Sequence, residues 1–225
     1  MALKMFSDIY KEIFPFWDEI SYSDKSIICE STRALSYPRG TCIHNGDGCS
    51  GVIIVRKGCL RIYIMSEDGK DVTLYRLHGG DICMLSASCV LQSVTFDIFV
   101  DAEEDSECYV IEDSAYSAVS ERNPNIKIFT LQTALGRFSD VMWVMQQILF
   151  FGVDRRLAIF LCEETARTNS LLIPYTHEQI AKYIGSAREV VSRMLKYFSN
   201  EGMVEVSRGG VKVLLPERLK TIAGN

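Results

Sequence analysis

The hydrophobic pattern of the chain changes its period at Asn123-Pro124, and this change limits the possible folds more than any other feature. Before it, apolar residues alternate with polar ones, as they do from Leu60 to Ile64. After it, apolar residues recur every three or four positions as far as Leu149. Asn is a favourable N-cap and Pro suits the first helical position. We therefore expect a β-rich segment followed by a long helix that begins here.

The long helix carries an apolar stripe with the spacing of a heptad repeat. Its members are Ile128, Leu131, Leu135, Phe138, Met142, Met145 and Leu149. A period of 3.5 residues is typical of a coiled coil. A second stripe runs beside it and consists of Ala134, Val141, Val144 and Ile148. One stripe can face a partner helix and the other the β-rich part, so we expect a homodimer with the heptad stripe as interface. The alternative is a helix buried within its own domain.

The segment from about residue 34 to residue 111 has the texture of an antiparallel β-structure. Short alternating runs, such as 60–64 and 94–100, are separated by turn signals such as Pro38-Arg39-Gly40 and Gly79-Gly80. Many short strands at such spacing predict a sandwich or barrel.

Two short helices joined by a tight turn are expected in the C-terminal third. Thr176 to Gln179 has the spacing of a capping box and predicts a helix to Ile184. Gly185 suits the turn, and Ser186 to Glu189 repeats the capping-box spacing before a second helix that runs to about Asn200. Two helices joined by a turn of this kind are typical of a helix-turn-helix.

The second of these helices is expected to read DNA, because a recognition helix enters the major groove with its N-terminus first. Arginine can bond both guanine O6 and N7, and glutamate can accept from cytosine N4. One face carries Arg188, Glu189, Ser192 and Arg193, and the opposite face carries Val190, Val191, Met194 and Leu195. The alternative is that Glu189 only caps the helix and the arginines are solvated.

Two short strands joined by Arg208-Gly209-Gly210 follow the second helix and predict a wing. With it, the expected DNA-binding residues are Thr176, Ser186, Arg188, Glu189, Ser192, Arg193, Lys196 and Arg208. The charge distribution agrees with this placement. Residues 152–225 hold 11 Lys and Arg against 8 Asp and Glu, although the whole chain has a net charge of −5. A mildly basic C-terminal part suits contact with phosphate.

Composition excludes several other classes of protein. The longest apolar stretch, 141–153, is interrupted by two glutamines and is too short to span a bilayer, and no signal peptide is visible. We therefore expect a soluble, cytoplasmic protein with reduced thiols. None of the eight cysteines forms a CxxC pair, which argues against closely spaced metal ligands. No catalytic motif is present beside the three histidines, so an enzyme is not expected.

The order of these features resembles the Crp–Fnr family of bacterial transcription regulators. The segments that carry the resemblance are GSAREVVSRML in the second helix, and RGTCIHNGD and VRKGCLRIYIMSEDGKDVTLYRLHGGDIC in the β-segment. The resemblance covers nearly the whole chain and implies an α+β fold. Its parts would be an N-terminal antiparallel, jelly-roll-like β-roll in a sensor domain (1–122), a dimerisation helix (123–152) and a winged helix-turn-helix (153–225). It also implies an inverted-repeat DNA site with a TGA core, and RNA polymerase as a candidate partner.

One departure from the family bears on the signal that the protein senses. Cyclic-nucleotide binders of the family carry a Gly-Glu pair after the GD turn and an Arg-Ser pair ten residues later. These positions are Met84, Leu85, Thr95 and Phe96 here. An unpaired phosphate would be costly to bury, so a cyclic nucleotide is not expected. The expected effector pocket is Met84, Leu85, Ser86, Ser88, Cys89, Thr95 and Phe96.

The sequence leaves the effector open. Cys29 alone stands near the region where iron–sulfur members carry their cluster, and His44 and His78 are more typical of turn or edge residues than of haem ligands. We therefore expect neither a metal nor another cofactor. Cys83 and Cys89 fit small core residues best, because free cysteine is often buried, and a thiol-based redox or metal sensor is the alternative. A further alternative is a regulator that binds DNA without any ligand.

Overall fold

The computed structural model describes residues 2–46, 51–84 and 97–224. It divides into two compact units, residues 1–65 with 75–140 and residues 66–74 with 141–225. The first unit contains most of the β-structure and the second contains the C-terminal helices. The N-terminal elements are α1 (Ala2–Ile13), the 3₁₀ turn η1 (Trp17–Glu19) and α2 (Tyr22–Glu30).

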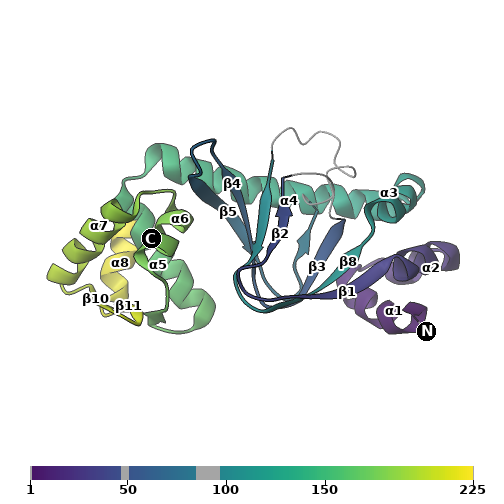
Figure 1. Cartoon of the computed structure of the whole chain (residues 1–225), viewed down its shortest axis with the longest axis horizontal. Helices are drawn as coiled ribbons and strands as arrows, with labels where there is room; N and C mark the ends of the chain where they lie inside the picture. The colour runs from purple at the N-terminus through teal and green to yellow at the C-terminus, as the bar shows by residue number, and fades with distance from the viewer. Residues whose placement is uncertain (1, 47–50, 85–96, 225) are drawn as a thin grey trace. The chain divides into compact units, whose positions relative to one another are not determined.

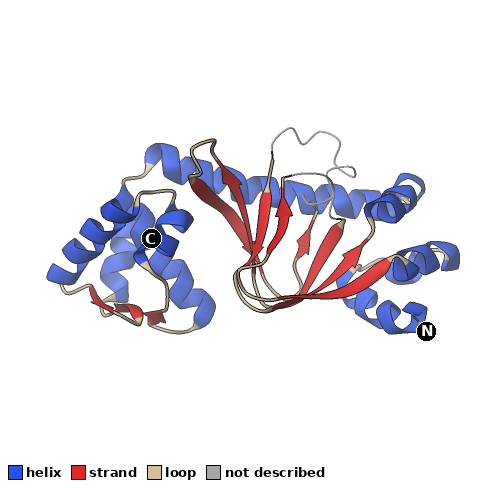
Figure 2. Cartoon of the chain, in the orientation of Figure 1, coloured by secondary structure: helices blue, strands red, loops and turns tan. Residues whose placement is uncertain are grey.

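Two four-stranded antiparallel sheets form the β-roll, as the alternating pattern predicts (Figures 1 and 2). The first sheet has the order β1-β8-β3-β6, and its strands are Thr32–Tyr37, Ser106–Ile111, Val52–Lys57 and Ile82–Cys83. The second has the order β2-β7-β4-β5, and its strands are Cys42–Asn45, Phe99–Ala102, Leu60–Met65 and Asp71–Leu77. The expected run 94–100 is described only from residue 97 onward.

The first sheet is covered by the N-terminal helices, which explains why strand β3 is buried along Val52–Val55. Val52 and Ile54 belong to one cluster with Tyr10, Phe14 and Trp17 from the N-terminal segment. Because successive side chains of a strand point to opposite faces, Ile53 and Val55 face the other way and are just as buried. A strand that is covered on both faces has a continuous run of apolar residues in its sequence, and not an alternation of apolar and polar residues.

Helix α3 (Asp113–Arg122), which the sequence pattern did not reveal, follows the last strand of the roll, and helix α4 (Pro124–Phe150) begins where the period changes. The Asn123 side chain accepts hydrogen bonds from the backbone N–H groups of Asn125 (3.1 Å) and Ile126 (3.4 Å), so it caps α4 as predicted. Ile126 is buried at the start of α4.

Helix α4 is fixed to the β-roll by a charged contact on its inner side. The Arg137 guanidinium lies 5.2 Å from the centre of the Tyr75 ring and pairs with Asp81 at 2.9 Å and Asp140 at 3.2 Å. The members of the second apolar stripe within α4 are largely half-buried. The heptad stripe is different, because each of its seven side chains is between 44% and 65% exposed in the single chain.

The second unit is a winged helix-turn-helix. Its remaining elements are α5 (Val153–Thr168), β9 (Leu172–Ile173), α6 (His177–Ile184), α7 (Arg188–Asn200), β10 (Val204–Ser207), β11 (Gly210–Val213) and α8 (Pro216–Ala223). Helices α5, α6, α7 and α8 share one apolar core that includes Leu157, Ile180, Val191, Leu195 and Leu219. The three strands form a sheet of order β10-β11-β9.

Candidate nucleic-acid interface

Helix α6 has the local structure that its sequence predicts. Thr176 Oγ1 accepts the backbone N–H of Gln179 (3.2 Å), and Gln179 Oε1 accepts the backbone N–H of Thr176 (2.9 Å). This reciprocal capping box fixes the first turn of the helix. The helix ends at Ile184, and Gly185 has φ +60°, a left-handed conformation that favours glycine. Both ends of α6 are therefore determined locally.

The start of α7 differs from the expectation. The capping box predicted for Ser186 to Glu189 does not form, because the N-cap is Ala187, one residue later. Ala187 has no side chain that could cap, and its carbonyl instead accepts the backbone N–H groups of Val190 (3.0 Å) and Val191 (3.1 Å). Glu189 is the second residue of the helix and is exposed. Its carboxylate therefore does not close a capping box.

The two faces of α7 are as different as predicted. Val191, Leu195 and Phe198 are buried in the core of the unit. Val190 and Met194, which were expected on the buried face, are half-buried. The outer face carries Arg188, Glu189, Ser192, Arg193 and Lys196, all exposed except the half-buried Ser192. Three cations and one acid thus stand on a polar helix face that the core does not cover.

The wing is a tight hairpin between β10 and β11. Ser207 is paired with Gly210, and Arg208 and Gly209 form the turn. Gly210 has φ +128°, and a Cβ atom there would lie 2.2 Å from the carbonyl oxygen of Ile173 in β9. No other residue fits this position without a shift of the backbone. The wing turn is consequently held against β9, a strand too short for the sequence pattern to reveal, and Arg208 stands exposed at its tip.

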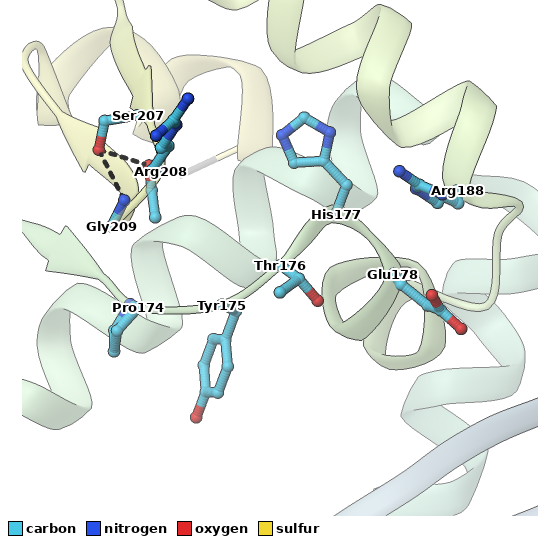
Figure 3. Close-up of a pocket in the computed structure, with 10 residues that line it drawn as sticks. Pro174, Tyr175, Thr176, His177, Glu178, Arg188, Ser207, Arg208 and Gly209 are labelled. Atoms are coloured by element: carbon cyan, nitrogen blue, oxygen red, sulfur yellow. Dashed lines mark hydrogen bonds between the residues drawn. The ribbon is translucent and has the colours of Figure 1, made fainter.

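A cleft of about 440 Å³ joins the wing to the helix-turn-helix (Figure 3). It is lined by Pro174, Tyr175, Thr176, His177, Glu178, Arg188, Ser207, Arg208, Gly209 and Gly210. Three of the predicted DNA-binding residues, Thr176, Arg188 and Arg208, therefore meet in one cleft, although they come from three different elements. Ser186, Glu189, Ser192, Arg193 and Lys196 are not part of its wall.

His177 also lines this cleft and was not predicted as a site residue. It is the first residue of α6, directly after the N-cap, and it is half-buried. The only signal in the sequence was its position beside Thr176, since the backbone N–H groups of a first helical turn attract anions.

Comparison with known proteins identifies the family. A Crp-like helix-turn-helix domain matches residues 155–222, and a cyclic nucleotide-binding domain matches residues 34–123. A solved structure of a Crp/Fnr-family protein from Eubacterium rectale is 39% identical, has a TM-score of 0.90, and covers 95% of this chain and 99% of that chain. The chain belongs to the Crp/Fnr family. It is a transcriptional regulator with a cyclic-nucleotide-binding-type β-roll and a DNA-binding helix-turn-helix.

Two named relatives of this Crp/Fnr protein differ in whether their names state a signal. Vfr of Pseudomonas aeruginosa, a cAMP-activated global transcriptional regulator, is 24% identical over 84% of this chain and 91% of its own length. The transcriptional activator protein FnrA of Stutzerimonas stutzeri is 24% identical over 82% of this chain and 77% of its own length. The match to the family therefore leaves the signal of this regulator open.

The β-roll of this Crp/Fnr protein contains one described member of the predicted effector pocket. Met84 follows β6 and is 1% exposed. Leu85, Ser86, Ser88, Cys89, Thr95 and Phe96 lie outside the described residues. Cys83, which would pair with Cys89 in the alternative of a thiol sensor, is fully buried beside Ile53 of β3. Burial at this depth suits a core residue, as the sequence suggested.

Several other thiols of the β-roll are protected by burial. Desolvation raises the pKa of Cys29 and Cys108 to about 11 and that of Cys59 to about 12. The reactive form of cysteine is the thiolate, so these thiols are unreactive at neutral pH. His44 lies on the edge strand β2, and the His78 backbone N–H donates to Asp81 in a turn (2.8 Å). Both histidines thus stand in an edge or a turn, as expected.

Two further findings limit the chemistry of the described ranges. Within residues 2–46, 51–84 and 97–224, no group of three or more His, Cys, Asp or Glu side chains is arranged to hold a metal ion. No helix in those ranges is long and apolar enough to cross a membrane.

Proposed function

We propose that this Crp/Fnr regulator binds an inverted-repeat DNA site as a homodimer, in the cytoplasm, in response to a signal other than a cyclic nucleotide. The observation that carries the DNA-binding part is the polar face of α7, which begins at the same cleft as the wing. A helix that enters the major groove and a wing that follows the backbone need this arrangement.

The outer face of α7 supplies the groups that a base-reading helix requires. We assign Arg193 to a guanine and Glu189 to the paired cytosine of a TGA-type half-site. We assign Arg188 to a further guanine or to a phosphate, because its side chain lines the cleft. Thr176 and Arg208, on the other walls of the cleft, would contact the DNA backbone. Ser186, Ser192 and Lys196 would extend this contact along the groove.

The exposed heptad stripe of α4 supports the homodimer. A helix with seven large apolar side chains at 44–65% exposure is unusual for a chain that stays monomeric. Pairing two such stripes about a two-fold axis would bury them and would place two α7 helices for an inverted repeat. RNA polymerase is the candidate partner through which the DNA-bound protein would regulate transcription.

The proposal about the signal rests on the residues at the β-roll pocket. Met84 is apolar and buried, and Leu85, Thr95 and Phe96 in the sequence also lack the charge that a cyclic phosphate needs. An uncharged small molecule would suit the pocket better than a nucleotide. The thiol alternative is less well supported, because Cys83 is buried in the core.

Selection of binding sites from random double-stranded DNA tests the function. We expect an inverted repeat whose half-sites are separated by about one helical turn, roughly 10 base pairs from centre to centre. Binding should weaken steeply with added salt, because phosphate contacts release counterions. A pool without any enriched sequence would contradict the proposal.

Arg208→Ala is the matched variant for this experiment, since Arg208 belongs to the tip of the wing and not to α7. It should weaken binding to all sequences alike and lower the salt slope by about one unit. The selected consensus should stay the same. A changed consensus would mean that the wing reads bases and that the assignment of α7 as the only reading element is wrong.

A further inference from the structure

A buried arginine on α5 contacts the turn of the helix-turn-helix. Arg156 Nη1 donates to the carbonyl oxygens of Ile184 (2.6 Å) and Gly185 (3.0 Å). These are the last residue of α6 and the left-handed residue that follows it. Ser186, one residue later, donates its N–H to Ala181 inside α6 (2.9 Å). Arg156 thus binds the two carbonyl groups at the junction of α6 and the turn.

The burial of Arg156 is costly and needs an explanation. The residue is 8% exposed, and burial lowers the pKa of its guanidinium. Its hydrogen bonds within the described residues go to backbone carbonyls, and its Nε atom is buried without a hydrogen-bond partner. What compensates the charge is the negative end of α6, because the carbonyl oxygens at a helix C-terminus carry partial negative charge.

The contact lies close to the start of the recognition helix. Only Gly185, Ser186 and Ala187 separate α6 from Arg188. The side chain of Ala187 cannot cap α7. The backbone of these three residues therefore sets the direction of α7 together with the core contacts of Val191 and Leu195. We infer that Arg156 is a positioning residue, which fixes this turn and thereby the angle at which the outer face of α7 meets the major groove. The inference rests on the DNA-binding function proposed above.

A positioning role differs from a purely stabilising role in what it does to specificity. Contacts with base edges carry the sequence information, whereas contacts with phosphate are made with DNA of any sequence. Loosening the turn should therefore reduce affinity for the selected site and leave affinity for unrelated DNA nearly unchanged. A residue that only stabilises the fold would leave the ratio of the two affinities unchanged in the folded fraction.

The test compares Arg156→Met and Arg156→Lys with the wild type, in the full chain and below the melting temperature of each variant. We expect the ratio of specific to non-specific affinity to fall roughly tenfold in Arg156→Met, as for the loss of one base contact. Arg156→Lys keeps the charge near the end of α6, so its affinity ratio should lie between those of the wild type and Arg156→Met. Hydrogen exchange should become faster at the amides of residues 185–188 in both variants.

Arg155→Met is the matched control. Arg155 is the neighbouring residue of α5 and also donates to a carbonyl at a helix end, that of Ala223 in α8 (3.1 Å). The Arg155→Met variant should lower the free energy of unfolding. It should leave the affinity ratio and the hydrogen exchange of the amides of residues 185–188 unchanged. If Arg156→Met does not fold, Arg156→Lys decides by the same two measurements. An unchanged affinity ratio in a folded Arg156 variant overturns the inference, whereas a wild type without sequence preference overturns the proposed function instead.

Discussion

Among single residues, Glu189 shows how the position of a helix N-cap decides between two roles of a side chain. The sequence allowed two roles for this acid, a member of a capping box or a reader of cytosine. Because α7 starts after Ala187, the capping box does not form and the carboxylate stays exposed on the outer face. The remaining contribution of Glu189 to stability is its charge near a helix N-terminus, typically about 0.3–1 kcal/mol.

The variant Glu189→Ala tests its role directly. We expect a small loss of stability, at most about 1 kcal/mol, and a loss of preference at one G·C pair of each half-site. Site selection and thermal unfolding measure the two effects separately. Glu217→Ala is a suitable control, because Glu217 is exposed, does not line the cleft, and is the second residue of α8 as Glu189 is of α7. An identical consensus for wild type and Glu189→Ala would reject base reading.

At the scale of elements, α4 combines two different surfaces on one helix. Its inner side is fixed to the β-roll by Arg137, with Tyr75 and Asp81, while its heptad stripe is exposed along the whole helix. A helix with one face buried by its own domain and another apolar face exposed has a strong reason to associate.

The variant Leu135→Asp tests this association. Leu135 is 65% exposed in the single chain, so the substitution should affect the stability of the monomer little. In a parallel dimer it would bring two charges together in an apolar seam, and light scattering at micromolar concentration should then show monomers. Gln132→Asp adds the same charge at an exposed position outside the stripe and should stay dimeric. Dimers of Leu135→Asp would contradict the interface.

At the scale of the whole molecule, the question is which signal controls DNA binding. The match to a cyclic nucleotide-binding domain shows the fold of the sensor, and one relative, Vfr, is named as cAMP-activated. Fold alone does not set the ligand, because the charge at particular pocket positions does so. Met84 is one of those positions, and its side chain is apolar and buried.

We therefore expect no measurable binding of cAMP or cGMP by calorimetry, and no change of DNA affinity on adding either. Vfr, under the same conditions, provides a positive control. A dissociation constant for cAMP in the micromolar range would show that other side chains neutralise the phosphate, and the proposal about the signal would then fail.

Features that depend on neighbouring residues could be predicted from the sequence alone. Asn123-Pro124 begins α4 and Thr176 with Gln179 begins α6, because a cap is made by groups within three or four residues. The faces of α7 and the heptad stripe of α4 also followed, since helical periodicity alone assigns them. The family resemblance rested on these same local patterns.

Features that depend on contacts between distant segments could not be predicted from the sequence. The two-residue strand β9 forms because β11 pairs with it, and this contact requires glycine at position 210. The shared cleft of Thr176, Arg188 and Arg208 and the bond from Arg156 to the turn likewise join residues 12 or more positions apart. Such pairs have no periodic signal, because their energy comes from packing and burial in the folded chain and not from local backbone preference.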